Sequence, residues 1–397
     1  MGHSIAIIIV GYNRIKSIER LISSLKSANY NENVDLIVSI DKSDSDAVET
    51  FADQIEWNVG KLVVDRHPQN LGLRNHIMSL GKWFNYYDAI IVLEDDVVVA
   101  PQFYEFAKKC VEKYYYDSII AGIGLYSYNL NYQNSLPFYP LKGAYDVYLM
   151  QCAMSWGQVW MKPQWQDFYS WYLNHEEIPD NNNIPIAIKK WPKSSWLKYH
   201  ISYCIECDKY FVYPYYALST NNSDCGTHNR GYFNHSLYQV QLQWLDKRNF
   251  ILPDIKDFDV IYDAFFNNID LYRYIDIPQK ECILDIYATR FNEKDNPVSK
   301  RYLLTYKKLN YKIVKTYGLQ YRPVELNIIL NSPGKGLYIY DLYQPHTHRG
   351  NYYPDFVLYS YYIRDFYAFM KQCGIGQYLI GPIKYIYNRI LSKKFHI

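Results

Sequence analysis

The sequence predicts an α/β protein built around a mainly parallel sheet with helices on both faces. Over the first 125 residues, apolar strand-like runs alternate with segments whose apolar residues recur at helical spacing. Alternation of this kind builds right-handed βαβ units, and therefore a parallel sheet that is covered on both sides. Two of the strand-like runs end in acidic residues, which places negative charge at the carboxyl edge of the predicted sheet.

The elements of this region follow one another in a regular order. Residues 5–12 are almost entirely apolar, as expected of a strand buried on both faces, and Ile15 and Ile18 then begin a helical stripe. A second helix is predicted from about Arg74, and another near Pro101, because proline suits the first turn of a helix. The other strands are predicted at residues 34–41, 61–67, 89–96 and 119–126.

The rest of the chain is less regular. From about residue 145 to residue 229 it is rich in Trp, Tyr, Pro and Asn, which predicts loops around an open site. Beyond about residue 251, short strand-like and helix-like runs indicate a separate α+β region. Residues 375–397 combine an apolar helical face with lysines and arginines, which is typical of a helix lying on an anionic bilayer. A terminal helix that packs on its own domain would explain the apolar face equally well.

Composition and charge exclude several classes of protein. The 397 residues carry a formal net charge of +2, which is too balanced for a protein that coats nucleic acid. The 7 cysteines are scattered without a disulfide or zinc-ribbon spacing, which indicates reduced thiols in a cytoplasm. No run reaches the ~18 apolar residues of a membrane span. We therefore expect a cytoplasmic protein that touches the inner face of the plasma membrane only peripherally, through residues 375–397.

The acidic strand ends are the first functional signal. Asp41 closes the second predicted strand, and Glu94, Asp95 and Asp96 close the fourth, between Ile-Ile-Val-Leu and Val-Val-Val. Carboxylates beside buried flanks are costly unless something compensates them, although a solvated acidic turn would need no compensation. Mn²⁺ or Mg²⁺ takes such hard oxygen ligands together with substrate phosphates. The triplet is therefore predicted to hold a metal-bound diphosphate at the edge where α/β sheets bind ligands.

Two common phosphate-binding loops are absent from the sequence. There is no GxxxxGK[ST] segment, and no GxGxxG follows the first strand. Their absence disfavours ATPases, kinases and dinucleotide-dependent dehydrogenases. An enzyme that holds a nucleotide sugar through a metal ion needs neither loop.

Several segments resemble a known family. "IIVGYNRIKSIERLISSL", "VSIDKSD", "NLGLRNHIMSLG" and "VLEDDVVVAPQFYEFAKKCVEKY" are similar to the nucleotide-binding half of GT-A fold glycosyltransferases. They most resemble the eukaryotic N-acetylglucosaminyltransferase I group and its bacterial relatives in capsule and lipopolysaccharide synthesis. "SWGQVWMKPQW" and "YPYYALSTNNSDCGTH" resemble two later motifs of those bacterial relatives, so that the resemblance covers about residues 4–230.

The resemblance implies a domain organisation. A GT-A domain, with a Rossmann-like sheet that binds a nucleoside diphosphate sugar, would occupy residues 1–250. Within it, residues 1–126 would form the nucleotide-binding half and residues 127–250 the acceptor half. Residues 251–397 would be a C-terminal accessory region of the α+β type, ending in the basic tail.

The resemblance also implies residue roles where the motifs match. Asp96 would bind the metal directly, and Asp95 would contact the ribose or a metal-bound water. Glu94 would contact the hydroxyls of the transferred sugar, and Asp41 would lie by the base. These four residues would bind the donor from two neighbouring strand ends.

Other matching residues keep two interpretations each. Arg14 in "YNR" would lie near the nucleotide, or would be an exposed arginine in the first turn of its helix. Arg74 in "LGLRNH" would help to neutralise phosphate, or would form a surface salt bridge. His228 in "CGTH" is either a second metal ligand or a histidine whose bonds stay within its loop. Trp156 and Trp160 either contact the acceptor sugar or fill the core.

The catalytic base is where this sequence departs from the family pattern. An inverting transfer needs a carboxylate to deprotonate the acceptor hydroxyl as it attacks the anomeric carbon. In the N-acetylglucosaminyltransferase I group that aspartate lies in a WDDW-like stretch, but the corresponding "SSWLKYH" has no acid. The nearby Glu206 and Asp208 are the predicted candidates.

The leading prediction is a metal-dependent, inverting glycosyltransferase that uses Mn²⁺ or Mg²⁺. It would move a hexosyl or N-acetylhexosaminyl group from a UDP-linked donor to a hydroxyl of a bacterial surface polysaccharide or lipopolysaccharide. A catalytically inactive sugar-binding or scaffold protein of the same fold is one alternative, because of the missing acid. A sugar nucleotidyltransferase is the other, although "GYNRIKS" lacks the glycine-rich loop of those enzymes.

Overall fold

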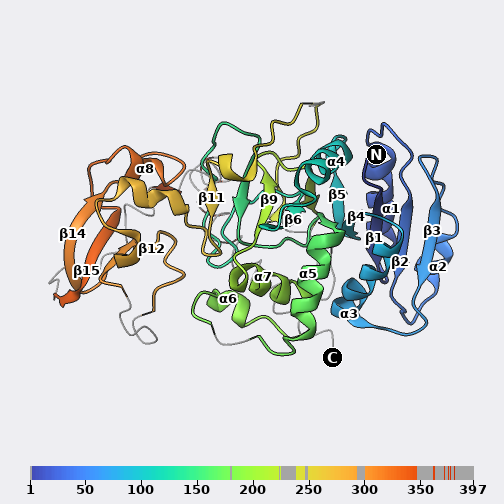
Figure 1. The fold of residues 1–397 in the computed structure, drawn as a ribbon, viewed down its shortest axis with the longest axis horizontal. Coiled ribbons are helices and arrows are strands. Elements are labelled where there is room, and N and C mark those ends of the chain that lie inside the picture. Colours follow the sequence, from blue (N-terminus) through green and yellow to red (C-terminus); the bar gives the residue numbers. More distant parts are fainter. Residues whose placement is uncertain are drawn as a thin grey trace. The chain divides into compact units, whose positions relative to one another are not determined.

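The chain forms two compact units in the computed structural model (Figure 1). The structure describes residues 2–178, 181–222, 224, 238–245, 249–292, 300–346, 361, 362, 371, 374, 376 and 380. The first unit comprises Met1–Asn129, Lys142–Asn222 and Tyr238–Phe266, and the second comprises Leu130–Leu141, Ser223–Leu237 and Asn267–Ile397. The first unit therefore extends beyond residue 250, where the sequence predicts the domain boundary. No helix among the described residues is both long enough and apolar enough to cross a bilayer.

The first unit is built on a nine-stranded sheet with the strand order β11-β7-β9-β6-β8-β4-β1-β2-β3. Its strands are β1 (Ile5–Gly11), β2 (Leu36–Ile40), β3 (Leu62–Arg66), β4 (Ala89–Glu94), β6 (Ile120–Gly124), β7 (Val147–Met150), β8 (Gln158–Met161), β9 (Tyr210–Pro214) and β11 (Ile261–Tyr262). Among the described residues, five pairings in this sheet are parallel and three are antiparallel. The prediction of a mainly parallel α/β sheet is confirmed.

The helices of the first unit are α1 (Ile15–Lys26), α2 (Ala47–Ala52), α3 (Gly72–Ser79), the 3₁₀ helix η1 (Leu80–Asn85), α4 (Phe103–Tyr114), α5 (Lys162–Leu173), α6 (Ile186–Lys189) and α7 (Trp196–Glu206), with the short 3₁₀ helix η3 (Ile255–Asp257) further on. Among them, α1, α3 and α4 lie where the sequence predicts helices. In α1, Ile18, Leu21 and Leu25 are fully buried in the main core. Burying each such side chain stabilises the fold by roughly 1.5–3 kcal/mol.

Within the region 145–229, the described residues are more regular than the sequence predicts. They contain β7, β8, β9 and the helices α5, α6 and α7, where loops were expected. The physical reason is that aromatic side chains on several faces of α5 pack against other aromatic rings, so the segment shows no clean apolar stripe. Trp165 of α5, for example, lies against Trp160 of β8 with ring centroids 4.5 Å apart.

A small antiparallel ladder connects two distant parts of the first unit. β5 (Val97–Val99) directly follows the acidic triplet and pairs with β10 (Ser219–Asn221). Asn221 lies opposite Val97, and the N–H of Asn222 donates to the carbonyl oxygen of Asp96 at 2.8 Å. The segment after residue 221 therefore starts beside the triplet.

The second unit has its own four-stranded sheet, in the order β12-β13-β15-β14. Its elements are the 3₁₀ helices η4 (Ile269–Tyr274) and η5 (Gln279–Glu281), the strands β12 (Cys282–Asp285), β13 (Tyr302–Thr305), β14 (Tyr311–Tyr317) and β15 (Leu337–Pro345), and helix α8 (Leu326–Ile329). Leu303, Tyr340 and Leu342 belong to its separate core. This unit has the predicted α+β character. The basic tail, residues 375–397, lies outside the described residues except for Gly376 and Ile380.

Candidate active site

The carboxyl ends of β1 and β4 lie side by side, at the point where the strand order reverses. The chain passes from β1 to β2 and β3 on one side, and β4 then pairs with the other side of β1. Val10 lies opposite Glu94 in this pairing, so the residues that follow the two strands meet at one edge. Open α/β sheets bind ligands at such a point, outside the carboxyl ends of their strands.

Arg14 is the counter-ion of the two aspartates that follow β4. Its Nε donates to Asp95 Oδ2 at 3.1 Å, and its Nη2 makes a second bond to Asp95 Oδ1. Its Nη1 donates to Asp96 Oδ2 at 3.4 Å. Arg14 is the N-cap of α1, where the helix dipole opposes a cation, and the two carboxylates offset that repulsion. Three predicted donor and metal residues are thus brought together by the pairing of β1 with β4.

Asp96 keeps one carboxylate oxygen directed at no protein partner. Its Oδ1 is buried and finds no hydrogen-bond donor among the described residues. An unpaired buried carboxylate oxygen costs free energy, which a bound cation would recover. In the described ranges, no three His, Cys, Asp or Glu side chains converge as a complete metal site. The residues therefore fit a Mn²⁺ or Mg²⁺ ion held by Asp96 together with diphosphate oxygens, a common arrangement for Mg²⁺.

The second predicted metal ligand is His228. It lies outside the described residues, so its role stays a prediction. Because β10 pairs with β5, Asn222 contacts Asp96 through a backbone hydrogen bond, and Asn222 lies six residues before this histidine in the sequence.

Glu94 is the third carboxyl group of the triplet, and its surroundings favour the protonated form. Burial raises its pKa to about 8, and the negative charges of Asp96 and Asp95 act in the same direction. The indole Nε1 of Trp196 donates to Glu94 Oε1 at 3.4 Å. A protonated carboxyl can both donate and accept hydrogen bonds, which suits contact with sugar hydroxyls. Trp196 is not among the site residues that the sequence predicts. The one feature of the sequence that could have indicated its role is its position in "SSWLKYH", between the two later motifs of the family.

Asp41 anchors the loop that follows β2. Its Oδ1 accepts from the backbone N–H groups of Lys42 at 3.0 Å and Leu71 at 2.8 Å, and its Oδ2 accepts from that of Gly72 at 2.9 Å. Gly72 begins α3 with a φ of +72°, a conformation that favours glycine. Asp41 thus satisfies donors at a helix N-terminus that would otherwise be unpaired. Its contact with the donor base, implied by the family resemblance, stays a prediction.

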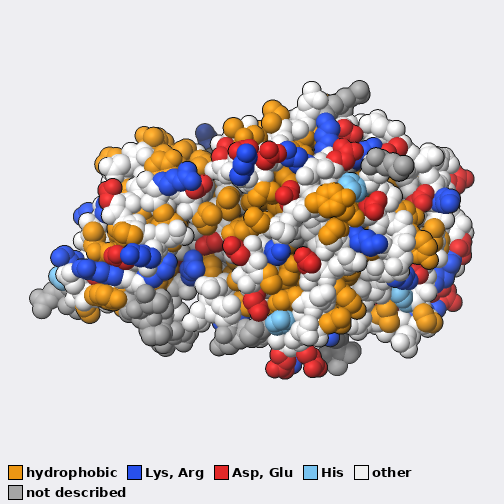
Figure 2. All heavy atoms as spheres, viewed as in Figure 1, with side chains coloured by type: hydrophobic (Ala, Val, Ile, Leu, Met, Phe, Trp, Pro, Cys, Tyr) orange, Lys and Arg blue, Asp and Glu red, His pale blue; other side chains and the backbone are white. Residues whose placement is uncertain are grey.

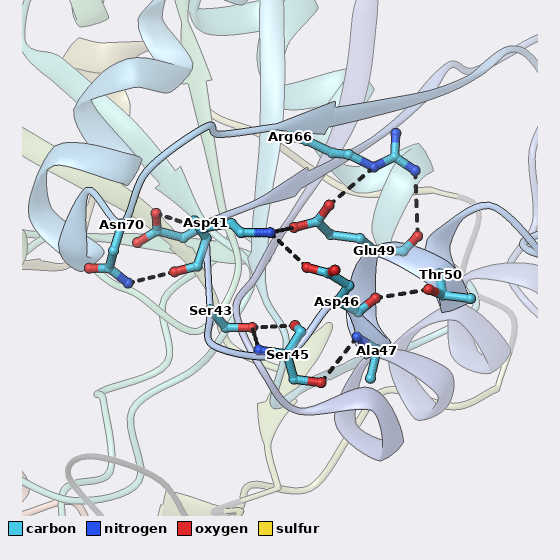
Figure 3. Close-up of polar contacts among 10 residues, drawn as sticks. Asp41, Ser43, Ser45, Asp46, Ala47, Glu49, Thr50, Arg66 and Asn70 are labelled. Atoms are coloured by element: carbon cyan, nitrogen blue, oxygen red, sulfur yellow. Dashed lines mark hydrogen bonds and ion pairs between the residues drawn. The ribbon is translucent and has the colours of Figure 1, made fainter.

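Polar contacts hold the rest of this loop to its neighbours (Figure 3). Lys42 Nζ bonds to Asp46 Oδ1 at 2.7 Å and to Glu49 Oε1 at 3.0 Å. Arg66 of β3 places its Nε 3.7 Å from Glu49 Oε2, and Asn70 Nδ2 donates to the Lys42 carbonyl oxygen at 2.8 Å. The loops after β2 and β3 therefore form one polar network at the carboxyl edge of the sheet.

Residues 6–156 match the family model described as Glycosyl transferase family 2. The match covers the strands and the acidic edge that form the site. This part of the chain is a glycosyltransferase domain of the GT-A fold. No curated protein matches the chain.

Several solved structures are distantly similar to the chain. TarS of S. aureus in complex with UDP-GlcNAc is 13% identical over 58% of this chain and 61% of that one, with a TM-score of 0.39. GalNAc-T7 with UDP, GalNAc and Mn²⁺ is 13% identical over 54% and 42% of the two chains, with a TM-score of 0.36. The Pyrobaculum calidifontis mannosyltransferase PcManGT with GDP-Man and Mn²⁺ is 10% identical over 43% and 47%, with a TM-score of 0.31. The matched part spans less than two thirds of each protein, and likenesses this distant say nothing about substrates.

Three other predicted site residues make contacts inside the first unit. Arg74 donates through Nη1 to a backbone carbonyl and to the Tyr199 hydroxyl, both at 2.9 Å, and its guanidinium lies over the Tyr199 ring. Trp160 is 1% exposed, so it fills the core and presents no surface to an acceptor. Trp156 is partly buried and packs against Tyr126 with ring centroids 5.0 Å apart.

The predicted catalytic bases lie at the far end of α7. The helix begins at Trp196 and ends at Glu206, so its rise separates these residues by about 15 Å. Glu206 Oε1 lies 3.4 Å from His175 Nε2, and Asp208 accepts a bond from the Tyr210 hydroxyl at 3.0 Å. The structure does not bring either acid to the triplet, and their role as a base stays a prediction.

Because Arg14 pairs with Asp95 and Asp96, we expect its positive charge to weaken the binding of Mn²⁺ at these aspartates. We expect Arg14→Gln to bind Mn²⁺ alone at least about tenfold more tightly than the unchanged protein, because the change removes a positive charge beside Asp95 and Asp96. Titration followed by the electron paramagnetic resonance of free Mn²⁺ measures this. Arg66→Gln is the control, since it removes an equal charge that pairs with Glu49. Equal Mn²⁺ affinity in the two variants would contradict the assignment.

His200 of α7 makes the stability of the domain depend on pH. It is 1% exposed, neither ring nitrogen has a described partner, and its ring stacks on Phe168 with centroids 4.1 Å apart. Burial lowers its pKa from 6.5 to about 3, so the unfolded chain binds a proton in this interval that the folded protein does not. The free energy of unfolding therefore falls as the pH drops from 6.5 toward 3.

We expect His200→Phe to raise the free energy of unfolding by about 1–3 kcal/mol at neutral pH, because it removes an unpaired buried polar group. The gain should grow by up to about 1.4 kcal/mol for each pH unit below 6.5. Urea denaturation at neutral and at mildly acidic pH measures both effects. His76→Phe is the contrasting variant, because that ring bonds to Ser39 Oγ at 2.8 Å and its loss should destabilise. If the increase in the free energy of unfolding of His200→Phe is no larger at acidic pH than at neutral pH, this explanation is wrong.

Proposed function

We propose that the protein is a metal-dependent, inverting glycosyltransferase that moves a sugar from a UDP-linked donor to a hydroxyl of a bacterial surface glycan. The observation that carries the proposal is the site at the ends of β1 and β4. There, Asp95 and Asp96 meet Arg14, and a buried oxygen of Asp96 lacks a protein partner. The match to glycosyl transferase family 2 over residues 6–156 supports the same chemistry.

The proposed reaction is a displacement at the anomeric carbon. The acceptor oxygen forms a bond to that carbon as the bond to the diphosphate oxygen breaks, and the hydroxyl proton passes to a base. Attack from the face opposite the leaving group inverts the configuration. A Mn²⁺ or Mg²⁺ ion bound at Asp96 would neutralise charge on the departing diphosphate.

The residues around the triplet would divide the work of donor binding. Arg14 holds Asp95 by two hydrogen bonds, which would orient this carboxylate for contact with the ribose or a metal-bound water. Glu94, whose pKa is raised to about 8 by burial, would form a hydrogen bond with a hydroxyl of the transferred sugar. The hydrogen bonds around Asp41 would keep the carboxyl edge of the sheet rigid, so that little conformational entropy would be lost when the donor binds.

The acceptor and the place of action rest on the sequence resemblance. A capsule or lipopolysaccharide acceptor would be extended in the cytoplasm, at the inner face of the plasma membrane. The basic tail, residues 375–397, would contribute a peripheral membrane contact there.

Thermal-shift measurements with nucleoside diphosphates, with and without Mn²⁺, test the proposal most directly. We expect UDP to raise the melting temperature only when Mn²⁺ is present, because Asp96 and the diphosphate hold the ion together. Metal-dependent hydrolysis of a panel of UDP-sugars then distinguishes an enzyme from a sugar-binding scaffold. Absence of any nucleotide effect in the presence of metal would refute the proposed function.

A further inference from the structure

One stretch of the second unit is strongly basic. Residues 300–346 contain eight lysines and arginines against two acidic residues, a formal charge of +6, whereas the whole chain carries +2. The two acidic residues, Glu325 and Asp341, are 1% and 2% exposed. Asp341 is also bonded by Arg301 at 2.7 Å. The negative charge of this stretch is therefore buried, whereas four of its eight lysines and arginines are exposed and the other four are partly exposed.

The exposed cations lie next to exposed apolar side chains at one end of the sheet. We call this surface the basic end; it is formed by Lys307, Lys308, Lys312, Ile313, Val314 and Tyr343, all of them exposed. The start of β14 and the end of β15 form it, because Lys312 lies opposite Asp341 and Ile313 opposite Tyr340. The Lys307 carbonyl oxygen accepts a bond from the Tyr340 hydroxyl at 3.1 Å, which fixes the preceding turn there.

Figure 2 shows Lys and Arg side chains beside hydrophobic ones over the part of the chain where Figure 1 labels β14 and β15. Ile313, Val314 and Tyr343 are 36%, 50% and 60% exposed. Burying such side chains on binding would contribute about 25 cal/mol for each Å² of apolar surface. Lys315, the residue after Val314, lies 3.7 Å from the exposed Asp276, which is an acidic neighbour of this surface.

The combination of charges and aliphatic groups distinguishes between partners. A hydrated polyanion would attract the lysines but would gain nothing from Ile313 and Val314. A bilayer interface accepts apolar side chains at the headgroup boundary, and its anionic headgroups attract lysines. β14 is also an edge strand, and lysines on an edge strand oppose pairing with a second copy.

We propose that the basic end binds the surface of a bilayer that contains anionic phospholipids. The surface belongs to the folded part of the second unit and is separate in sequence from the tail at 375–397. The proposal does not rest on the transferase activity, so it can fail or hold independently of the proposed function.

Co-sedimentation of the full-length protein with vesicles tests the proposal. Vesicles of phosphatidylcholine alone are compared with vesicles that also contain phosphatidylglycerol. The triple variant Lys307→Glu, Lys308→Glu, Lys312→Glu is expected to bind the anionic vesicles at least about tenfold more weakly, since each lysine near such a surface contributes ~1 kcal/mol. The matched control is Lys16→Glu, Lys26→Glu, Lys61→Glu in the first unit, three exposed lysines with the same total change in charge. The control is expected to bind as the unchanged protein does.

A second variant separates the apolar contribution from charge. Ile313→Ser with Val314→Ser alters only exposed side chains, so the fold should persist, as near-ultraviolet circular dichroism can verify. We expect this variant also to bind anionic vesicles more weakly, at unchanged net charge. Equal losses in the two triple variants, or no loss in the serine variant, would overturn the proposal. Self-association of the protein alone that the serine variant abolishes would assign the surface to a second copy instead.

Discussion

Asp96→Asn is expected to lower the metal-dependent cleavage of a UDP-sugar at least about a hundredfold. The change keeps the shape of the side chain but removes the charge that would hold a divalent cation against the diphosphate. A cation bound there would lower the barrier by several kcal/mol, and each 1.36 kcal/mol is about a tenfold change in rate. Release of UDP from a donor sugar at saturating Mn²⁺ measures the effect. Because Asp96 Oδ1 has no described protein partner, the fold itself should lose little stability.

The control for this change is Asp254→Asn. Asp254 forms a surface ion pair with Lys113 of α4, so its replacement removes an equal charge away from the triplet. Its cleavage rate should match that of the unchanged protein. Thermal shift gives an independent readout, since UDP with Mn²⁺ should stabilise the Asp254 variant and not the Asp96 variant. Nucleotide stabilisation that persists in Asp96→Asn would refute the assignment of the cation site.

Asp41→Asn is expected to lower the free energy of unfolding by about 2–4 kcal/mol, because one of the two oxygens that accept from backbone N–H groups becomes an amide nitrogen, which cannot accept. These donors are at Lys42, Leu71 and Gly72, and Asp41 is 4% exposed, so water does not replace the lost acceptor. Urea denaturation without donor measures the loss, which should appear as a lower midpoint with an unchanged slope.

Asp46→Asn is the matched change within the same loop. Asp46 bonds Lys42 at 2.7 Å, but its side chain is 75% exposed. A surface ion pair of this kind contributes about 0–1 kcal/mol, so the variant should be nearly as stable as the unchanged protein. Asp41→Asn with full stability and weakened nucleotide binding would instead favour a contact between Asp41 and the donor base alone.

Much of the nucleotide-binding half could be predicted from the sequence. The strands β1, β2, β3, β4 and β6 lie within a residue or two of their predicted ends, because continuous apolar runs record burial on both faces of a sheet. The acidic triplet could likewise be placed at the carboxyl edge, since that follows from the order of strands and helices. Local patterns were sufficient here because each element's neighbours in the sheet follow the βαβ rule.

The acceptor half could not be predicted in the same way. β8 enters the sheet antiparallel between β4 and β6, and no local pattern specifies such a partner. Aromatic residues also lie on several faces of α5, so its sequence shows no apolar stripe that would predict a helix. Trp160 illustrates the consequence, since its burial against Trp165 leaves it in the core rather than at an acceptor surface.

The sequence by itself determined the α/β class, the acidic carboxyl edge and the resemblance to glycosyltransferases. Only the tertiary structure decided how the charges of the site are compensated. Arg14 is separated from Asp95 by 81 positions, and Trp196 from Glu94 by 102, yet each pair is joined by a hydrogen bond. The physical reason is that periodicity reports which side chains are buried, whereas the pairing of buried charges depends on strand register and helix placement across the whole domain.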